Sequence, residues 1–186
     1  MGFSDNDLTR PMKRMSRLTA RFAAAALVAT ALSALPASAS TAENGYTPEQ
    51  VCGSGFGKVT GGTKAVTDAR DIVRGYVYLL YNARTGENCV VTIKSSFVGQ
   101  PTLTRATLFV EVAGRDNADK FEDVGTYKSY AGPVKAQAKD ICVAFNGFIS
   151  DLGAKEKPSA FTVRASGGST GFGNCGTQRM GIRGIR

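Results

Sequence analysis

Alternating hydrophobic positions mark two neighbouring strands near the middle of the chain. Residues 76–81 are aromatic, β-branched or Leu, and residues 89–94 are rich in Val, Thr and Ile, compositions that favour strands. The Gly and Asn residues within 82–88 are typical of a chain reversal. The pattern therefore predicts a β-hairpin. Its buried face is predicted to carry alternate residues of both strands: Val77, Leu79, Tyr81, Cys89, Val91 and Ile93.

Tyrosines lie on the opposite face of this hairpin. Tyr76 and Tyr78 project from it, and Tyr127 and Tyr130 lie on a later candidate strand. Brought together, the four would form an amphipathic aromatic patch suited to a glycan or protein partner. The alternative is that a second sheet covers this face, which the usual burial of aromatics in sandwiches favours. We treat the four tyrosines as candidate surface-contact residues.

Further short strand signals are separated by Gly-rich connections. Residues 104–112 alternate most regularly, and weaker signals cover 58–60, 121–130, 141–149 and 160–165. Helical signals are few. The pattern predicts an all-β fold: a disulfide-stapled antiparallel β-sandwich or open barrel of about seven short strands.

Two segments fit more than one element. Residues 65–74 are ambiguous between a helical turn and an edge strand, and residues 135–139 suggest one helical turn after the bend at Pro133.

The N-terminal region has the pattern of a secretory signal peptide. Residues 22–35 are almost continuously apolar, Pro36 follows, and Ala37-Ser38-Ala39 is a small-x-small cleavage site. As a helix, residues 22–35 span about 21 Å, too short for a hydrocarbon core of roughly 30 Å. No transmembrane segment is therefore expected in the mature chain. A basic cluster precedes the apolar run: Lys13, Arg14, Arg17 and Arg21.

These boundaries divide the chain into four parts. Residues 1–39 are the predicted signal peptide, with Met12 or Met15 as an alternative start, and residues 40–50 are a polar lead-in. Residues 51–176 form the predicted secreted β domain, and residues 177–186 form a basic tail. The tail carries three arginines of unassigned role: Arg179, Arg183 and Arg186.

The cysteines all lie after the predicted cleavage site. An even number behind a secretion signal indicates disulfides before it indicates a metal. The chain has no histidine and no CxxC pair, so no metal site or cofactor is expected. Three pairings are possible, and a meandering sheet favours the sequential one, Cys52 with Cys89 and Cys142 with Cys175.

The charge balance is basic but dispersed. From Ser40 onward, 18 Lys and Arg residues stand against 13 Asp and Glu residues, which leaves a net charge of +5. Nucleic-acid binding would favour a basic stripe with interleaved aromatics, and the sequence has none. Weak attraction to anionic polymers of the cell wall or spore surface is the more modest expectation.

The sequence offers little for catalysis. Absence of histidine excludes Ser-His-Asp and Cys-His hydrolase arrangements. Acidic residues could in principle supply a glycosidase pair or a calcium loop, but neither the paired spacing nor the alternating ligand pattern is present. We therefore expect solvated surface acids and no enzymatic activity. These acids are Glu111, Asp116, Asp119, Glu122 and Asp123.

Several short sequence motifs together resemble those of the spore-associated protein A family of actinomycetes. They are CGSG at 52–55, VYLLYN at 77–82, TGENCVVT at 85–92, YAGPV at 130–134 and NCG at 174–176. The resemblance implies a small extracellular protein found with the spore or cell surface, and it supplies no reaction.

Signal peptide, cystines and resemblance together favour one function. We expect a secreted, non-enzymatic protein of the bacterial cell or spore surface that acts by contact with surface polymers. The alternative is a small secreted inhibitor or ligand-binding module, with an exposed loop that engages an extracellular enzyme or glycan. A hydrolase that uses Asp and Glu alone is the least favoured interpretation.

Overall fold

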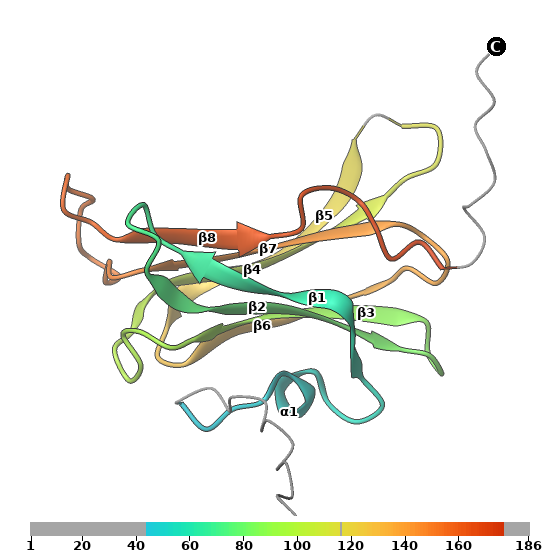
Figure 1. Cartoon of the computed structure of the whole chain (residues 1–186), viewed down its shortest axis with the longest axis horizontal. Helices are drawn as coiled ribbons and strands as arrows, with labels where there is room; N and C mark the ends of the chain where they lie inside the picture. Colours follow the sequence, from blue (N-terminus) through green and yellow to red (C-terminus); the bar gives the residue numbers. More distant parts are fainter. Residues whose placement is uncertain (1–43, 116, 177–186) are drawn as a thin grey trace, which may run out of the picture. The chain divides into compact units, whose positions relative to one another are not determined.

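Figure 1 shows a computed structural model of the chain, in which residues 44–115 and 117–176 are described. The predicted signal peptide, Asp116 and the tail with Arg179, Arg183 and Arg186 lie outside the described residues. The elements are α1 (Pro48–Cys52), β1 (Gly57–Thr67), β2 (Val73–Asn82), β3 (Glu87–Lys94), β4 (Thr102–Glu111), β5 (Ala118–Tyr127), β6 (Tyr130–Gln137), β7 (Val143–Ser150) and β8 (Arg164–Gly168).

The strands form one antiparallel sheet in the order β5-β4-β7-β8-β1-β2-β3-β6. In Figure 1 the first four strands lie above the other four, with α1 below. The two ends of the sheet, β5 and β6, contact each other, so the sheet is nearly closed and barrel-like. The predicted all-β class is confirmed.

The additional strand is β6, where the sequence predicted a bend and a helical turn. Its inward positions Ala131, Val134 and Ala136 are buried, and it pairs with β3. Pro133 obscured this pattern because proline cannot donate to a ladder. Gly132 has φ 103°, and a Cβ there would lie 2.7 Å from the carbonyl oxygen of Val90. This close approach accompanies the irregular register between β3 and β6.

The predicted register of the β2–β3 hairpin is wrong by one residue. Leu80 pairs with Cys89 and Tyr78 with Val91, because the turn begins directly after Asn82 and is closed by the Gly86 N–H donating to the Asn82 carbonyl. A slip of one residue moves every side chain to the other face. Tyr76 and Tyr78 therefore share their face with Cys89 rather than opposing it, and Tyr81, paired with Asn88, lies on the other face.

The interior contains the main hydrophobic cluster, drawn from seven of the strands and the segment after β6. Its layers approach closely at Gly75 and Gly147, where a Cβ would lie 2.5 Å from Ile149 Cδ1 and 2.7 Å from Val77 Cβ, respectively. The cluster consists of Val66, Val77, Leu79, Val90, Ala106, Leu108, Val110, Ala131, Val134, Ala136, Ala138, Val143, Phe145, Ile149 and Ala165.

A second, smaller cluster lies outside the sheet, under α1. Thr47 caps this short helix by accepting the Gln50 N–H, and the Gln50 side chain accepts the Thr47 N–H in return. The lead-in thus begins to fold before residue 51, where the domain was predicted to start. The cluster consists of Cys52, Phe56, Tyr78, Leu80, Cys89, Val91 and Ile93.

Two disulfides fix the ends of the domain, and they are the sequential pairs. Cys52–Cys89 joins the end of α1 to β3, and Cys142–Cys175 joins the start of β7 to the C-terminal segment. Beside the second bridge, Val143 and Gly173 form an isolated antiparallel bridge. The predicted strand at 160–165 is displaced, since β8 begins at Arg164 and the preceding residues belong to a loop.

Candidate functional site

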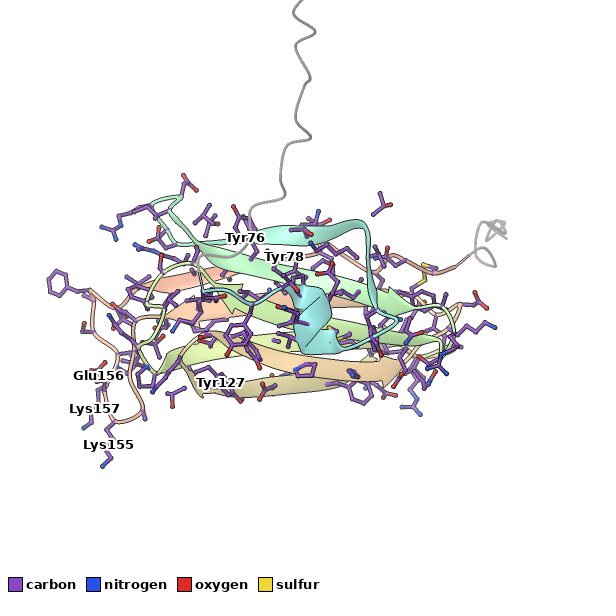
Figure 2. All side chains as sticks on the ribbon, turned by 90° about the horizontal axis from the view of Figure 1, so that it is seen from below. Tyr76, Tyr78, Tyr127, Lys155, Glu156 and Lys157 are labelled. Atoms are coloured by element: carbon purple, nitrogen blue, oxygen red, sulfur yellow. A yellow bond between two sulfur atoms is a disulfide. The ribbon has the colours of Figure 1, made fainter. Side chains whose placement is uncertain are left out.

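The candidate tyrosines do not form one patch. Tyr76 and Tyr78 lie near each other beside α1, with ring centroids 6.2 Å apart (Figure 2). Tyr130 lies on the same outer face and packs edge-on against Tyr46. Tyr78 is only 8% exposed, so the expectation of a surface contact is wrong for this residue. The face is covered, although by α1 and its lead-in rather than by a second sheet.

Tyr127 is separated from the other three because it lies on the inward side of β5. Its hydroxyl donates to Oδ1 of Asp123, and this hydrogen bond is the main reason that the pKa of Tyr127 rises to about 12. Oδ2 of Asp123 accepts the N–H of Gly132 on β6 at 2.6 Å. The Asp123–Tyr127 pair therefore joins the two ends of the sheet and is not part of an exposed aromatic surface.

The acidic residues considered for catalysis have other partners. Glu122 accepts from Lys120 at 2.8 Å, and Asp119 lies 4.0 Å from Arg115. Glu111 lies at the end of β4 and is half-buried. Within residues 44–115 and 117–176, no group of three or more metal-ligating side chains comes together. Ion pairs and hydrogen bonds thus engage Asp119, Glu122 and Asp123.

A buried lysine closes one end of the interior. Lys94 is 0% exposed, and its ammonium donates to the carbonyl oxygens of Gln100 (2.9 Å) and Tyr127 (3.0 Å) and to Oγ1 of Thr102 (2.8 Å). Burial lowers the pKa of Lys94 to about 8. Since three hydrogen bonds occupy all three donors of the ammonium, this lysine is suited to holding the 95–102 connection rather than to attacking a substrate.

A hollow of about 350 Å³ lies on the outer face of β4, β5 and β7, opposite the interior cluster. Cross-strand pairing produces it. In the central row Thr107 lies between Glu122 of β5 and Asn146 of β7, and in the next row Phe109 lies between Lys120 and Ala144. The lining residues are Arg105, Thr107, Phe109, Lys120, Ala144, Phe145, Asn146 and Ser169.

This hollow contains unpartnered polar atoms. Among the described residues, Arg105 Nε and Thr107 Oγ1 are the buried side-chain polar atoms without a hydrogen-bond partner, and both line it. Buried polar groups are normally hydrogen-bonded. Two unsatisfied groups at alternate positions of one strand therefore indicate a place where a ligand or water supplies the missing bonds. This is the candidate functional site.

Sequence reasoning missed this site. The regular alternation of residues 104–112, which places Arg105, Thr107 and Phe109 on one face of the strand, is the one available signal. It could not show that β4 lies between β5 and β7, and therefore could not place Lys120 and Asn146 beside them.

A second exposed feature is the loop of residues 151–163. Phe161 at its tip is 92% exposed. The tip is ordered by local hydrogen bonds: Ser159 Oγ accepts the Phe161 N–H, and the Ser159 carbonyl accepts the Thr162 N–H. Figure 2 shows Lys155, Glu156 and Lys157 on the same loop, at one end of the domain.

The fold and this site define a small, disulfide-linked all-β protein with a polar hollow on the outer face of its sheet. In the described part of the chain, no helix is long and apolar enough to cross a membrane. No family model and no solved structure matches the chain.

Spore-associated protein A of Streptomyces coelicolor is 38% identical to this chain over 128 residues, which cover 69% of the chain and 72% of that protein. The chain belongs to the spore-associated protein A family.

Proposed function

We propose that this protein works outside the cell, at the spore or cell surface, by binding rather than by catalysis. Two observations support the location. A relative that is 38% identical over 128 residues is named for its association with spores, and both disulfides need an oxidising compartment to form and persist.

The binding role is supported by a contrast between the unpartnered polar atoms of the hollow and the partnered carboxylates nearby. In the hollow, an arginine and a threonine have polar atoms without protein partners. The carboxylates near the same strands are engaged, as in the Glu122–Lys120 ion pair and the Asp123–Gly132 hydrogen bond. A site that offers unpaired polar groups beside engaged carboxylates is suited to holding a ligand.

Spore fractionation tests this function. Protein should be recovered with intact spores or the culture medium, and the spore-bound fraction should be released by a salt wash because the contact is electrostatic. A lysed-spore fraction serves as the control for internal protein. Recovery in the cytosolic fraction alone would refute the proposal.

The exposed loop favours a second candidate function, engagement of an extracellular protein. A phenylalanine held in an ordered, solvent-exposed turn resembles the aromatic anchors that dominate protein interfaces. The loop lies between Cys142 and Cys175, so the second disulfide restrains the segment that contains it.

Capture from the culture medium tests this second function. The oxidised protein and a Phe161→Ala variant are immobilised, with Phe172→Ala as the control, since Phe172 is also exposed but lies outside the loop. A secreted protein should bind the wild type and the control but not Phe161→Ala. Equal capture by all three would exclude Phe161 as the anchor.

A further inference from the structure

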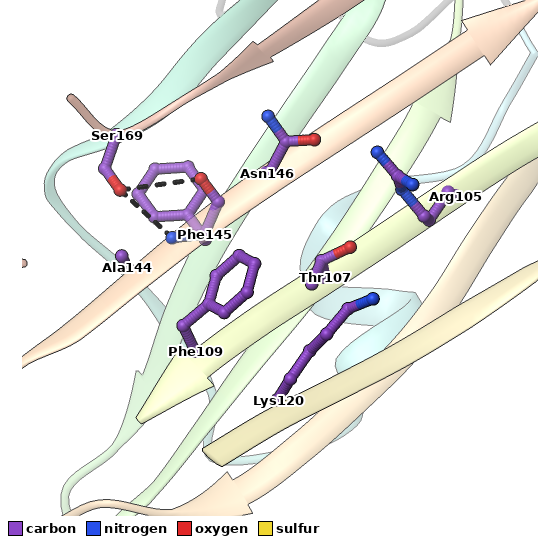
Figure 3. A pocket seen from close by; sticks show the side chains of 8 residues that line it. All are labelled: Arg105, Thr107, Phe109, Lys120, Ala144, Phe145, Asn146 and Ser169. Atoms are coloured by element: carbon purple, nitrogen blue, oxygen red, sulfur yellow. Dashed lines mark hydrogen bonds between the residues drawn. The ribbon is translucent and has the colours of Figure 1, made fainter. Parts of the chain in front are cut away.

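We propose that the hollow on β4, β5 and β7 binds an anionic sugar unit, a saccharide that carries a carboxylate or phosphate, of an envelope glycan. This inference rests on the proposed surface function and names its ligand class. Figure 3 shows the residues that line the site.

Arg105 supplies the charge. Its guanidinium carbon lies 5.6 Å from the ring centroid of Phe148, its cross-strand neighbour on β7. Stacking over an aromatic ring holds the guanidinium in place. Its Nε, on a residue that lines the hollow, has no hydrogen-bond partner. A guanidinium edge matches the two oxygens of a carboxylate or phosphate, so an oxyanion is the group that best satisfies it.

Thr107 and Asn146 supply neutral hydrogen-bonding groups beside this charge. Thr107 is only 2% exposed and its hydroxyl has no partner, while Asn146 lies directly across the ladder on β7. A hydroxyl and a carboxamide each donate and accept. Together they suit the hydroxyl groups of a sugar, which also donate and accept.

Phe109 and Lys120 complete the site. They are cross-strand partners, and in Figure 3 both side chains lie beside Thr107. The Phe109 ring offers an apolar surface for the C–H face of a sugar, and Lys120 adds a cation that Glu122 partly neutralises at 2.8 Å. A volume of about 350 Å³ falls within the usual range of ligand pockets, roughly 300–1,000 Å³. One dominant charge with polar and apolar walls favours a sugar acid or sugar phosphate over a bare inorganic ion.

The test is a titration of the isotope-labelled, oxidised protein followed by amide chemical shifts. The probes are methyl glucuronide for the carboxylate, glucose 6-phosphate for the phosphate, and neutral methyl glucoside. We expect saturable amide shifts at residues 105–109 and 144–146 with at least one anionic probe. Methyl glucoside should bind at least about tenfold more weakly, because it cannot form the charge-assisted hydrogen bond. The probe that binds more tightly identifies the anion.

Two variants test the roles of Arg105 and Thr107 in binding. Arg105→Gln should weaken binding of the anionic probe at least about tenfold, and Thr107→Val should weaken it while leaving the other amide shifts in place. Arg164→Gln, at an exposed position of β8, is the matched control and should bind as the wild type does. Absence of saturable shifts with both anions, equal binding of the neutral sugar, or unchanged binding by Arg105→Gln would overturn the proposal.

Failure of this inference is distinguishable from failure of the surface function. If wild-type protein is recovered on spores but binds neither anionic sugar, the ligand assignment alone is refuted. Wild-type protein that binds an anionic sugar but is found in the cytosol alone would refute the proposed location alone.

Discussion

The carboxylate of Asp123 on β5 accepts the N–H of Gly132 on β6 at 2.6 Å, and this hydrogen bond connects the two strands that end the sheet. Chain connectivity also favours this closure, since β5 ends at Tyr127 and β6 begins at Tyr130, although the two strands occupy opposite ends of the strand order. The side chain of Asp123 therefore joins β5 and β6, which have no backbone ladder between them in the strand order. We call this contact the β5–β6 seam.

Asp123→Asn should weaken this seam and change the titration of Tyr127. Loss of the charged acceptor should lower the free energy of unfolding by about 1–3 kcal/mol. It should also return the pKa of Tyr127 from about 12 toward its ordinary value of 10.0, because the hydrogen bond to Asp123 is what raises it. Ultraviolet titration of the phenolates and urea unfolding measure the two effects.

The control is Asp119→Asn, which removes an exposed acid of the same strand and should change stability by no more than about 0.5 kcal/mol. If Asp123→Asn leaves the tyrosine titration curve unchanged, the seam is not held in this way.

Lys94→Met should change how stability depends on pH. Burial lowers the pKa of Lys94 to about 8, from 10.5 in its ordinary environment. Between these values the unfolded chain binds more protons than the folded one, so the free energy of unfolding rises with pH. Wild-type protein should therefore gain stability relative to Lys94→Met from about pH 8 to about pH 10.5.

Urea unfolding across this range measures the gain, with the exposed Lys128→Met as the control that keeps the wild-type slope. Parallel curves for the wild type and Lys94→Met would contradict the interpretation of Lys94 as a buried cation.

Asp68→Asn should remove an acid-sensitive contribution from the turn between β1 and β2. Oδ2 of Asp68 accepts from Nε and Nη2 of Arg74 at 3.0 and 2.7 Å, and Oδ1 accepts the N–H groups of Arg70 and Ile72. The Arg74 hydrogen bond is the largest cause that lowers the pKa of Asp68 to about 2. The stabilisation is therefore present above about pH 4 and is lost as the pH falls toward 2.

Unfolding measured from pH 5 to pH 2 should show a steeper loss of stability for the wild type than for Asp68→Asn. Asp71→Asn is the matched control, since Asp71 is exposed and its φ of 60° suits asparagine as well. A wild-type curve no steeper than that of Asp68→Asn would show that Asp68 does not carry this stabilisation.

The double variant Cys52→Ala/Cys89→Ala should lose about 4 kcal/mol of stability, because the bridge closes a loop with a sequence separation of 37. It should also release α1 from β3 and expose Tyr78, which α1 and its lead-in cover. Denaturant unfolding gives the first value, and nitration of Tyr78 reports the second. A variant in which Tyr78 stays protected would show that α1 docks without the bridge.

Sequence reasoning located most strands because their alternation is local. It failed where the deciding contact lies on another strand. The hairpin register depended on whether Asn82 or a later residue begins the turn, and β6 was obscured by Pro133. A lysine at an alternating position is normally solvated, so nothing in the sequence indicated that Lys94 faces the interior.

The candidate site was harder to predict for the same reason. Thr107 and Asn146 are distant in sequence and meet only because β4 pairs with β7. Alternation within β4 identifies which of its residues point outward, but the unpaired hydroxyl and guanidinium nitrogen become visible only once the neighbouring strands are in place.

The most direct test of the surface function is protease shaving of intact spores followed by mass spectrometry. Peptides from this chain, including the 151–163 loop, should be released from intact spores, with Cys52–Cys89 and Cys142–Cys175 still oxidised. Release only after the spores are broken, or recovery of the four cysteines as free thiols, would contradict the surface function.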